Sequence, residues 1–367
     1  MKAENNLRKK IFKLITHTAI LILIALFTGQ VVAQEQTEQD KERIRKAKIK
    51  LYSEVEHLYK FGEPEENGKK TVEISYDGYG NLTEQSIFGE EGELVYRSTF
   101  AFDANNNKIE EAMYSGGDLE YRYVYKFEGD QLKEKVNYGS GGEIEAKFIY
   151  DFNGFGDLEK ETEYTSDGEI VTRKVYQYTD ARKLEKSILY DADGVPTEKY
   201  SYRYDEAGNL VEVIVYDEEG SVISKNQKKF DNANRLTEEL VYDGDGSLMS
   251  KKSMKYDDGG NLTESTTFGD GGSMLENIKF KYDDKGRVAE ETKFEEGDRI
   301  YTKKMSYNSK GDVSELLDDR PNDDIYIKID FSYDDARRVT EKTVYDRLNE
   351  PIKLIRVNYD LYWYSRQ

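Results

Sequence analysis

The chain lacks cysteine altogether and has only two histidines, His17 and His57, among its 367 residues. Without thiols there can be no disulfide, no lipid attachment at cysteine and no thiol chemistry. Serine, cysteine and zinc hydrolases also lack their usual catalytic parts here. Carboxylates recur throughout the chain, so any one pair is more typical of structure than of glycoside chemistry. We therefore expect a protein that is not an enzyme and holds no cofactor.

Basic residues are in deficit, because 54 Lys and Arg face 74 Asp and Glu, for a net charge of −20. Such a chain repels nucleic acid and anionic membranes, so neither is an expected partner. Hydrophobic residues make up only 37%, and 30 residues are tyrosines. This composition is too polar for a thick three-layer core and too aromatic for a disordered chain.

Only one apolar run stands out, Ala19–Phe27, preceded by five basic residues and followed by Val31-Val32-Ala33. This layout predicts a secretory signal peptide over residues 1–33. The alternative is a membrane anchor, for which the run is short. Removal of residues 1–33 changes the net charge to −24, because five basic residues and one acidic residue are lost. We expect an exported protein of the periplasm, cell surface or extracellular space, with no membrane span after cleavage.

A tyrosine or phenylalanine followed in most cases by an acidic or amide residue recurs at a period of about 26 residues, which identifies a repeat protein. Tyr178-Thr179 is the one departure from this pattern. The anchor positions are Tyr76, Phe102, Phe127, Phe152, Tyr178, Tyr204, Phe230, Tyr256, Tyr282, Tyr307, Tyr333 and Tyr359. Repeat proteins commonly present an extended surface in place of one active-site cleft.

Each repeat contains two extended stretches and two turns of the Asp-x-x-Gly type, such as Asp205–Gly208 and Asp217–Gly220. The Asp accepts backbone N–H bonds, and the Gly supplies the positive φ of a type I turn with a bulge. The fold predicted for residues 70–367 is all-β. Tandem β-hairpin repeats form one long curved or spiral antiparallel sheet, because strand twist accumulates.

Residues 36–60 carry an apolar stripe at helical spacing, formed by Ile44, Ala47, Leu51, Val55 and Leu58. We expect a helical cap and linker over residues 34–69, covering the first open edge of the sheet. The alternative is a coiled-coil or partner-binding helix. At the other end, an aromatic segment at 359–364 closes the array, with Trp363 packed on the last strand.

Aromatic or apolar residues recur at the anchor and two residues before it, and further aromatic residues such as Tyr216 and Tyr242 stand twelve residues after it. A strict period of two places all of them on one face of the sheet. These tyrosines are candidates for stacking on sugar rings or on a partner strand. The candidate binding residues are Tyr125, Tyr150, Tyr176, Tyr202, Tyr216, Tyr242 and Tyr282.

Two charged columns accompany the aromatic ones. Glutamates such as Glu212 and Glu238 stand eight residues after the anchor, and cations such as Lys225 and Lys251 stand five before it. The bulged turn predicts that the two columns point to opposite faces. The glutamates should then lie among the aromatic rings, bonded to tyrosine hydroxyls.

Calcium is the metal to consider, because Asp191–Gly194 and Asp243–Ser247 resemble the start of a calcium loop. Neither segment continues to the later glutamate that such a loop needs. Turn formation is the favoured role, and no metal is expected.

The segments Tyr76–Glu84, Tyr256–Glu264 and Tyr282–Val288 resemble the tyrosine-aspartate (YD) repeats of the bacterial RHS family. The resemblance covers about residues 71–360. In that family such repeats build β-sheet that can wind into a hollow shell around a toxin domain. The period here is longer and more even. The long conserved core segment of that family and an extra C-terminal domain are not recognisable, so the resemblance does not imply toxin delivery.

We therefore predict a non-enzymatic exported scaffold of the bacterial envelope that binds a glycan or protein partner through an aromatic sheet face. A hollow shell or carrier, as in RHS-type proteins, and a purely structural spacer are the alternatives. The sequence identifies neither the ligand nor the oligomeric state.

Overall fold

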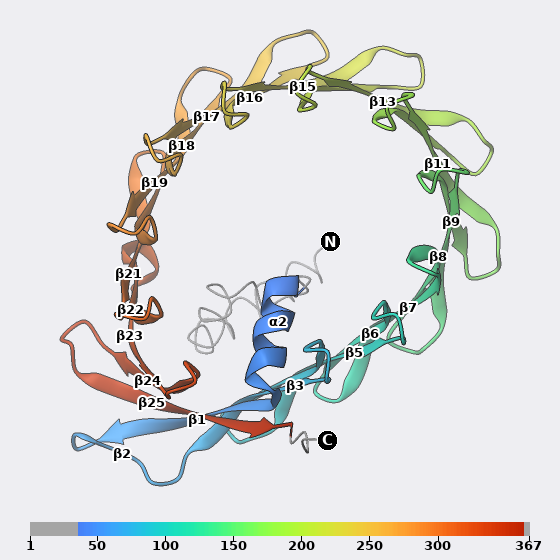
Figure 1. The fold of residues 1–367 in the computed structure, drawn as a ribbon. Helices are drawn as coiled ribbons and strands as arrows, with labels where there is room; N and C mark the ends of the chain where they lie inside the picture. The colour runs from blue at the N-terminus through green and yellow to red at the C-terminus, as the bar shows by residue number, and fades with distance from the viewer. Residues whose placement is uncertain (1–35, 363–367) are drawn as a thin grey trace. The chain divides into compact units, whose positions relative to one another are not determined.

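The computed structural model describes residues 36–362, which form one α-helix, one short 3-10 turn and 25 strands assigned to one antiparallel sheet (Figure 1). The described chain divides into two compact units. Unit 1 holds residues 36–101, 112–118 and 327–362, and unit 2 holds residues 102–111 and 119–326. Within residues 36–362, no helix is both long and apolar enough to cross a membrane. The expected signal peptide and Trp363 lie outside the described residues.

Helix α2 (Glu38–Ala47) is much shorter than the predicted helix. Thr37 caps it by accepting a bond from the Asp40 backbone N–H at 3.1 Å, and Lys48 ends it with a φ of 55°. The chain continues as strand β1 (Ile49–Lys60). The predicted helix beyond residue 47 is therefore wrong. Pairing on both sides of β1 outweighs a stripe whose spacing suits a helix.

The residue Gln36, just before the helix, is bonded to the turn at residues 77–81. The Gln36 side chain donates to the Gly80 carbonyl at 2.8 Å and accepts from the Leu82 N–H at 2.9 Å. Figure 1 shows α2 beside β3 (Lys69–Tyr76), the strand that leads into this turn. The expected role as an edge cap is thus not the observed one.

Unit 1 brings together strands from both ends of the chain. Their order is β23, β24, β25, β1, β3, β4, β5, and the short β2 pairs with the end of β1. The bounds are β2 Glu63–Pro64, β3 Lys69–Tyr76, β4 Leu82–Phe88, β5 Leu94–Phe102, β23 Ile325–Tyr333, β24 Val339–Tyr345 and β25 Pro351–Leu361.

The first and last long strands pair with each other. Ser53 of β1 lies opposite Asn358 of β25 on one side and opposite Glu73 of β3 on the other. Neither β1 nor β25 presents a free edge of unpaired N–H and C=O groups. The predicted open curved or spiral sheet is therefore wrong: the sheet is closed, with the connectivity of a β-barrel.

Unit 2 is a meander in which each strand from β8 to β21 pairs with its sequence neighbours. The remaining strands are β6 Lys108–Ser115, β7 Asp118–Glu128, β8 Gln131–Tyr138, β9 Ile144–Phe152, β10 Leu158–Thr165, β11 Ile170–Tyr178, β12 Leu184–Tyr190, β13 Pro196–Tyr204, β14 Leu210–Tyr216, β15 Val222–Phe230, β16 Leu236–Asp243, β17 Leu248–Tyr256, β18 Leu262–Gly269, β19 Met274–Tyr282, β20 Val288–Glu295, β21 Asp298–Tyr307 and β22 Val313–Arg320, followed by the 3-10 turn η1 Pro321–Asp323.

The Tyr-Asp pair ends one strand and starts the turn into the next, as predicted. Strand β13 ends at Tyr204, and the Asp205 carboxylate accepts the Asn209 backbone N–H at 2.8 Å. Gly208 donates to the Asp205 carbonyl at 3.1 Å with a φ of 94°, a conformation that glycine adopts without strain. Each such turn also shifts the strand register by one residue, here between Arg203 and Tyr204.

That register shift changes which residues share a face. Tyr202 lies opposite Val213, whereas Tyr216 lies opposite Lys199, so the two tyrosines point to opposite sides. The prediction of one common aromatic face is therefore wrong, because a bulge adds a residue between the columns. We call the side of unit 2 with Tyr125, Tyr150, Tyr176 and Tyr202 the tyrosine face, and the side with Tyr216, Tyr242 and the Glu212 column the charged face.

Candidate functional site

Strands β7 to β13 gather aromatic side chains on the tyrosine face. Aromatic residues suit extended, half-buried strand positions, and their alternation with polar residues keeps them on one side. All of them are half-buried, and no helix of unit 2 covers them in the described structure. They are Tyr121, Tyr123, Tyr125, Phe127, Phe148, Tyr150, Phe152, Tyr176, Tyr178, Tyr200, Tyr202 and Tyr204.

Polar groups lie among these rings. Tyr121 and Tyr123 stack with ring centroids 4.8 Å apart, and the Lys135 Nζ lies 4.3 Å from the Tyr123 centroid. On β11, the Tyr176 hydroxyl donates to Glu161 Oε2 at 3.2 Å. Aromatic rings, a cation and carboxylates therefore share one partly exposed surface, which can offer both stacking and hydrogen bonds.

The hydroxyls of Tyr125, Tyr150 and Tyr176 stay neutral at physiological pH. Burial, aided by the nearby Glu161 carboxylate, raises the pKa of Tyr150 to about 12. Burial also raises the pKa of Tyr125, with Glu111 adding to the shift, and that of Tyr176, with Glu161 adding to it. A neutral phenol can donate one hydrogen bond and accept others. These groups are suited to binding and not to proton transfer near pH 7.

Four of the seven predicted binding residues, Tyr125, Tyr150, Tyr176 and Tyr202, lie on the tyrosine face within β7 to β13. The Tyr202 hydroxyl lies 3.2 Å from Ser187 Oγ on the neighbouring strand. The structure brings these four together along alternate strands.

Of the other three predicted residues, two lie on the charged face, and one lies on the tyrosine face beyond β7 to β13. Tyr216 and Tyr242 are on the charged face, where the Lys225 Nζ lies 4.6 Å from the Tyr242 ring centroid. Tyr282 is an anchor residue, and its hydroxyl donates to the Leu262 carbonyl at 2.7 Å. Its role is to join two repeats.

The same anchor bond recurs along the array. The hydroxyl of an anchor tyrosine donates to the carbonyl of the residue six positions after the preceding anchor, at 2.8 Å for Tyr178 to Leu158, 2.8 Å for Tyr256 to Leu236 and 3.0 Å for Tyr359 to Val339. Each bond links strands of neighbouring repeats. The bonded anchors therefore have a structural role, which distinguishes Tyr178, although it also lies on the tyrosine face, from Tyr176 two residues before it.

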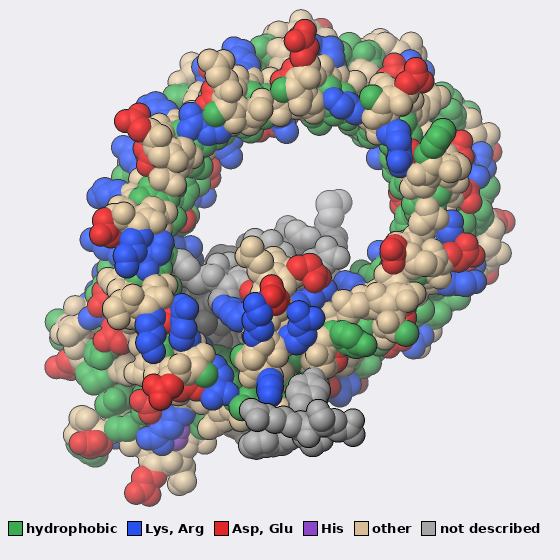
Figure 2. Space-filling model, viewed as in Figure 1, with side chains coloured by type: hydrophobic (Ala, Val, Ile, Leu, Met, Phe, Trp, Pro, Cys, Tyr) green, Lys and Arg blue, Asp and Glu red, His purple; other side chains and the backbone are tan. Residues whose placement is uncertain are grey.

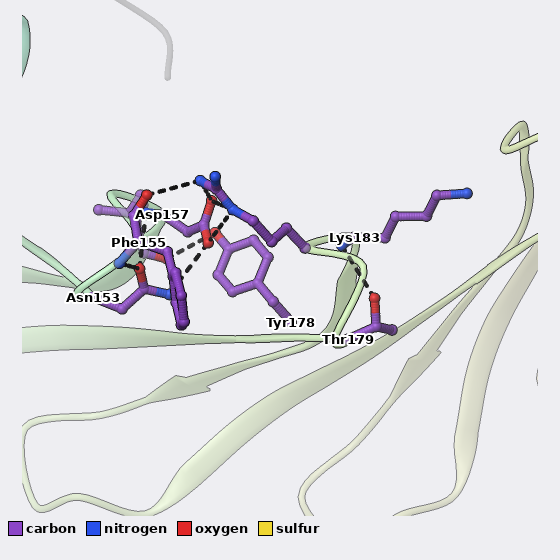
Figure 3. Close-up of polar contacts among 8 residues, drawn as sticks. Asn153, Phe155, Asp157, Tyr178, Thr179 and Lys183 are labelled. Carbon is purple, nitrogen blue, oxygen red and sulfur yellow. Dashed lines mark hydrogen bonds and ion pairs between the residues drawn. The ribbon is translucent and has the colours of Figure 1, made fainter.

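Neighbouring Tyr-Asp turns are also bonded to each other, as Figure 3 shows around Tyr178 and Asp157. Arg182 donates from Nε to Asp157 Oδ2 at 3.1 Å and from Nη2 to the Phe155 carbonyl at 2.9 Å. The bond from Arg182 lowers the pKa of Asp157. Asn153 in turn accepts the Asp157 N–H at 3.0 Å. Arg182 is exposed and Asp157 half-buried, and their bonds fix one turn against the next.

The charged face corrects a second prediction. Glu238 lies between two lysines, 2.6 Å from Lys229 Nζ and 2.5 Å from Lys251 Nζ, and these bonds lower its pKa. The glutamate and cation columns therefore share a face, because the register shifts again between Val241 and Tyr242. In Figure 2, acidic and basic side chains are interspersed over the face in view. The carboxylates bonded to tyrosine hydroxyls are others, such as Glu161 on the tyrosine face.

Sequence reasoning missed one buried charged cluster in unit 1. Lys342 of β24 and Glu54 of β1 form an ion pair with side chains only 1% and 5% exposed. Lys342 Nζ also donates to the Tyr52 hydroxyl at 3.1 Å, and Tyr52 donates to Glu54. Burial lowers the pKa of Lys342 and raises that of Tyr52 well above its usual value. The pair spans β25 and joins the two ends of the sheet.

The calcium candidates act as turns. The Asp243 carboxylate accepts the backbone N–H groups of Ser247 at 2.8 Å and Asp245 at 3.1 Å, and Asp191 bonds Val195 in the same way. Within residues 36–362, no cluster of three or more His, Cys, Asp or Glu side chains is arranged to hold a metal.

Comparison with known proteins leaves the family open. No family model matches the chain, and no curated protein matches it. Similar solved structures include one of TcdB2-TccC3-TEV, at 11% identity over 79% of this chain and a TM-score of 0.27. This chain spans 19% of that one.

Two further solved structures are similar at the same low level. A porin-like protein from Bacteroides uniformis has 8% identity over 85% of this chain and 98% of its own, with a TM-score of 0.26. The Hsv2 protein of Kluyveromyces marxianus has 11% identity over 70% and 95%, with a TM-score of 0.22. Scores this low carry no argument about fold or function, so the resemblance to RHS repeats stays a prediction.

Proposed function

We propose that the protein is a non-enzymatic, exported binding scaffold that takes a glycan on the tyrosine face of β7 to β13. The observation that carries the proposal is the run of half-buried tyrosines on one face of unit 2, with carboxylates and lysines among the rings. Tyrosine offers a large, rigid contact area at low cost in side-chain entropy, together with a hydroxyl for hydrogen bonding.

A glycan fits this surface better than a protein partner does. The centre of a protein interface is depleted of charged residues. Here Lys135, Glu161 and Lys174 stand among the rings themselves, and Lys174 Nζ lies 5.4 Å from the Tyr200 centroid. A sugar presents apolar C–H faces and many hydroxyls, so it can use rings and charged groups together.

The surface also has the extent of a short polymer. Strands pack about 4.8 Å apart, so β7 and β13 are separated by roughly 29 Å along the sheet. An oligosaccharide lying across the strands would meet Tyr125, Tyr150, Tyr176 and Tyr202 in turn. Affinity would then accumulate from several weak contacts, each too small to bind alone.

Two elements of the proposal rest on the sequence. Export rests on the signal-peptide pattern of residues 1–33, and the absence of catalysis rests on the scarcity of histidine and the lack of cysteine. The competing role is a spacer in which tyrosines serve packing alone. The buried part of each ring supports that role, whereas the part that stays exposed supports binding.

A glycan array tests the proposal. The purified protein should bind at least one class of oligosaccharide and should prefer longer chains over the monosaccharide. Binding should persist in about 0.5 M salt, because stacking and neutral hydroxyls are not screened as exposed ion pairs are. If folded protein at a concentration of about 100 μM gives no signal on the array, glycan binding is excluded and the spacer role is favoured.

A further inference from the structure

The turns at the opposite edge of unit 2 from the Tyr-Asp turns carry exposed apolar side chains in a row. These turns connect β8–β9, β10–β11, β12–β13, β14–β15, β16–β17 and β18–β19. We call residues 139–145, 165–171, 191–197, 217–223, 243–249 and 269–275 the acidic rim. Its exposed apolar residues are Ile144, Val171, Val195, Val222, Ile223, Met249, Met274 and Leu275.

The apolar side chains of the acidic rim expose a large fraction of their surface to water. Ile223 is 47% exposed, Met249 49% and Leu275 41%. Single exposed apolar residues are normal on a protein surface, but one or two in each of six successive hairpins are not, and Val171, Ile223, Met249 and Leu275 occupy equivalent positions in four of the hairpins. Such rows mark interaction surfaces, because they leave apolar area in contact with water until a partner covers it.

The charge of the rim is of one sign. The six segments contain no Lys or Arg, and no ion pair among the described residues involves any of their carboxylates. Their acidic residues are Glu143, Glu145, Asp167, Glu169, Asp191, Asp193, Asp217, Glu218, Glu219, Asp243, Asp245 and Asp270. The opposite edge differs, since Arg182, Arg235 and Arg287 are bonded to the Asp residues of its turns.

The spacing of the row suits a helix. Ile223, Met249 and Leu275 occupy equivalent positions in successive repeats, on the side of Lys225 and Lys251. Equivalent positions are two strands apart, or about 9.6 Å. Seven residues of an α-helix rise about 10.5 Å, so apolar residues at heptad spacing would meet one rim residue per repeat.

We propose that the acidic rim docks a basic amphipathic helix of a partner protein. Apolar residues at heptad spacing would cover Ile223, Met249 and Leu275, and flanking Lys and Arg side chains would face the acidic turns. A second copy of this chain is a poor occupant, because two acidic rims repel each other. Anionic lipid is repelled for the same reason.

Fluorescence anisotropy with the full-length protein tests this docking. The probe is a labelled synthetic helix of Leu and Lys with leucines at heptad spacing, and the control peptide has the same composition with the leucines distributed around the helix. The heptad peptide should bind at least about tenfold more tightly, as expected for covering several apolar side chains at once. Equal affinity of the two peptides, or no binding of either, overturns the proposal.

Matched variants locate the contact. Ile223→Ser/Met249→Ser/Leu275→Ser should weaken binding of the heptad peptide about tenfold or more. Phe155→Ser, at a 77% exposed position on the opposite edge, should change it less than about twofold. All four positions are exposed, so the fold should tolerate the changes. Equal effects of the two variants, or rim-dependent binding to phosphatidylcholine vesicles in place of the peptide, would exclude helix docking at the rim.

Discussion

The ion pair between Lys342 and Glu54 should contribute strongly to the free energy of unfolding, because it joins strands from the two ends of the chain. Lys342 lies on β24 and Glu54 on β1, and the two side chains meet across β25. Replacement of Glu54 by Gln keeps the shape of the side chain and removes its charge. The lysine, 1% exposed, would then keep its charge in an apolar setting with the Tyr52 hydroxyl, 3.1 Å away, as its described partner.

Loss of one partner of a buried pair costs about 3–5 kcal/mol, because the other charge remains buried without compensation. A matched control stands on the same strand. Glu56 pairs with Lys353 at 3.0 Å, and both side chains are about one-fifth exposed. Glu56→Gln should therefore cost no more than about 1 kcal/mol.

Urea unfolding followed by circular dichroism measures both costs, with the midpoint compared at constant slope. The Glu54→Gln variant should also gain stability as the pH rises. Burial lowers the pKa of Lys342, so above that pKa the unfolded state binds more protons than the folded state. The triple variant Tyr52→Phe/Glu54→Leu/Lys342→Met should recover to within about 1 kcal/mol of wild type. Equal costs for Glu54→Gln and Glu56→Gln would refute the reasoning.

Three further predictions concern the array itself. In this cysteine-free chain, Ser53→Cys/Asn358→Cys should form a disulfide on oxidation, because facing residues of an antiparallel pair are about 4.5–5.5 Å apart at Cα. The control Ser53→Cys/Arg356→Cys joins residues that do not face each other, so it should form no disulfide. Mass spectrometry distinguishes the oxidised from the reduced protein. Stability should fall between pH 10 and 12 in alkaline titrations followed by circular dichroism. Burial raises the pKa values of Tyr76 and Tyr150 to about 12, and the hydrogen bond to Glu198 together with burial raises that of Tyr200 to about 12, so these tyrosines ionise first in the unfolded state. A stability that stays flat over this range would contradict these surroundings of the three hydroxyls. Tyr256→Phe should lower the free energy of unfolding, measured in urea, by about 0.5–1.5 kcal/mol, because it removes the bond to the Leu236 carbonyl. Tyr79→Phe, at a 63% exposed position, should leave the free energy of unfolding almost unchanged. Equal losses for the two variants would show that the anchor bond does not stabilise the fold.

Local chemistry made the repeat predictable. The Asp205 carboxylate and the positive φ of Gly208 form the turn from residues adjacent in sequence, so strand ends such as Tyr204 follow from the pattern. The prediction of which residues share a face was wrong for an equally local reason. The bulge at each turn shifts the register by one residue, which sends Tyr202 and Tyr216 to opposite faces.

Closure of the sheet could not be predicted from neighbouring residues. Ser53 and Asn358 face each other from opposite ends of the chain, and no local pattern encodes that pairing. Leu51, Val55 and Leu58 fit a helical stripe, and only the strands on both sides of β1 make the extended form the stable one. The burial of Lys342 follows from the same long-range contact, so it could not be predicted from the sequence pattern either.

The candidate site was predicted in part. Tyr125, Tyr150, Tyr176 and Tyr202 were correctly placed on one face, because they occupy equivalent positions in successive repeats. If every repeat has the same number of bulges, equivalent positions in successive repeats lie on the same face, whatever that number is. The relation between different columns depends on the bulge count, which the sequence pattern does not show.

The most direct test of the account compares two faces of one sheet. The affinity of the glycan that binds best on the array should be measured by titration calorimetry for wild type, for Tyr150→Leu/Tyr176→Leu/Tyr202→Leu and for Tyr216→Leu/Tyr242→Leu on the charged face. Circular dichroism confirms that each variant is folded. The account predicts a loss of at least about tenfold for the first variant, because several stacking contacts vanish together, and less than about twofold for the second. Equal losses on the two faces, or a larger loss on the charged face, would contradict the assignment of the tyrosine face as the binding surface.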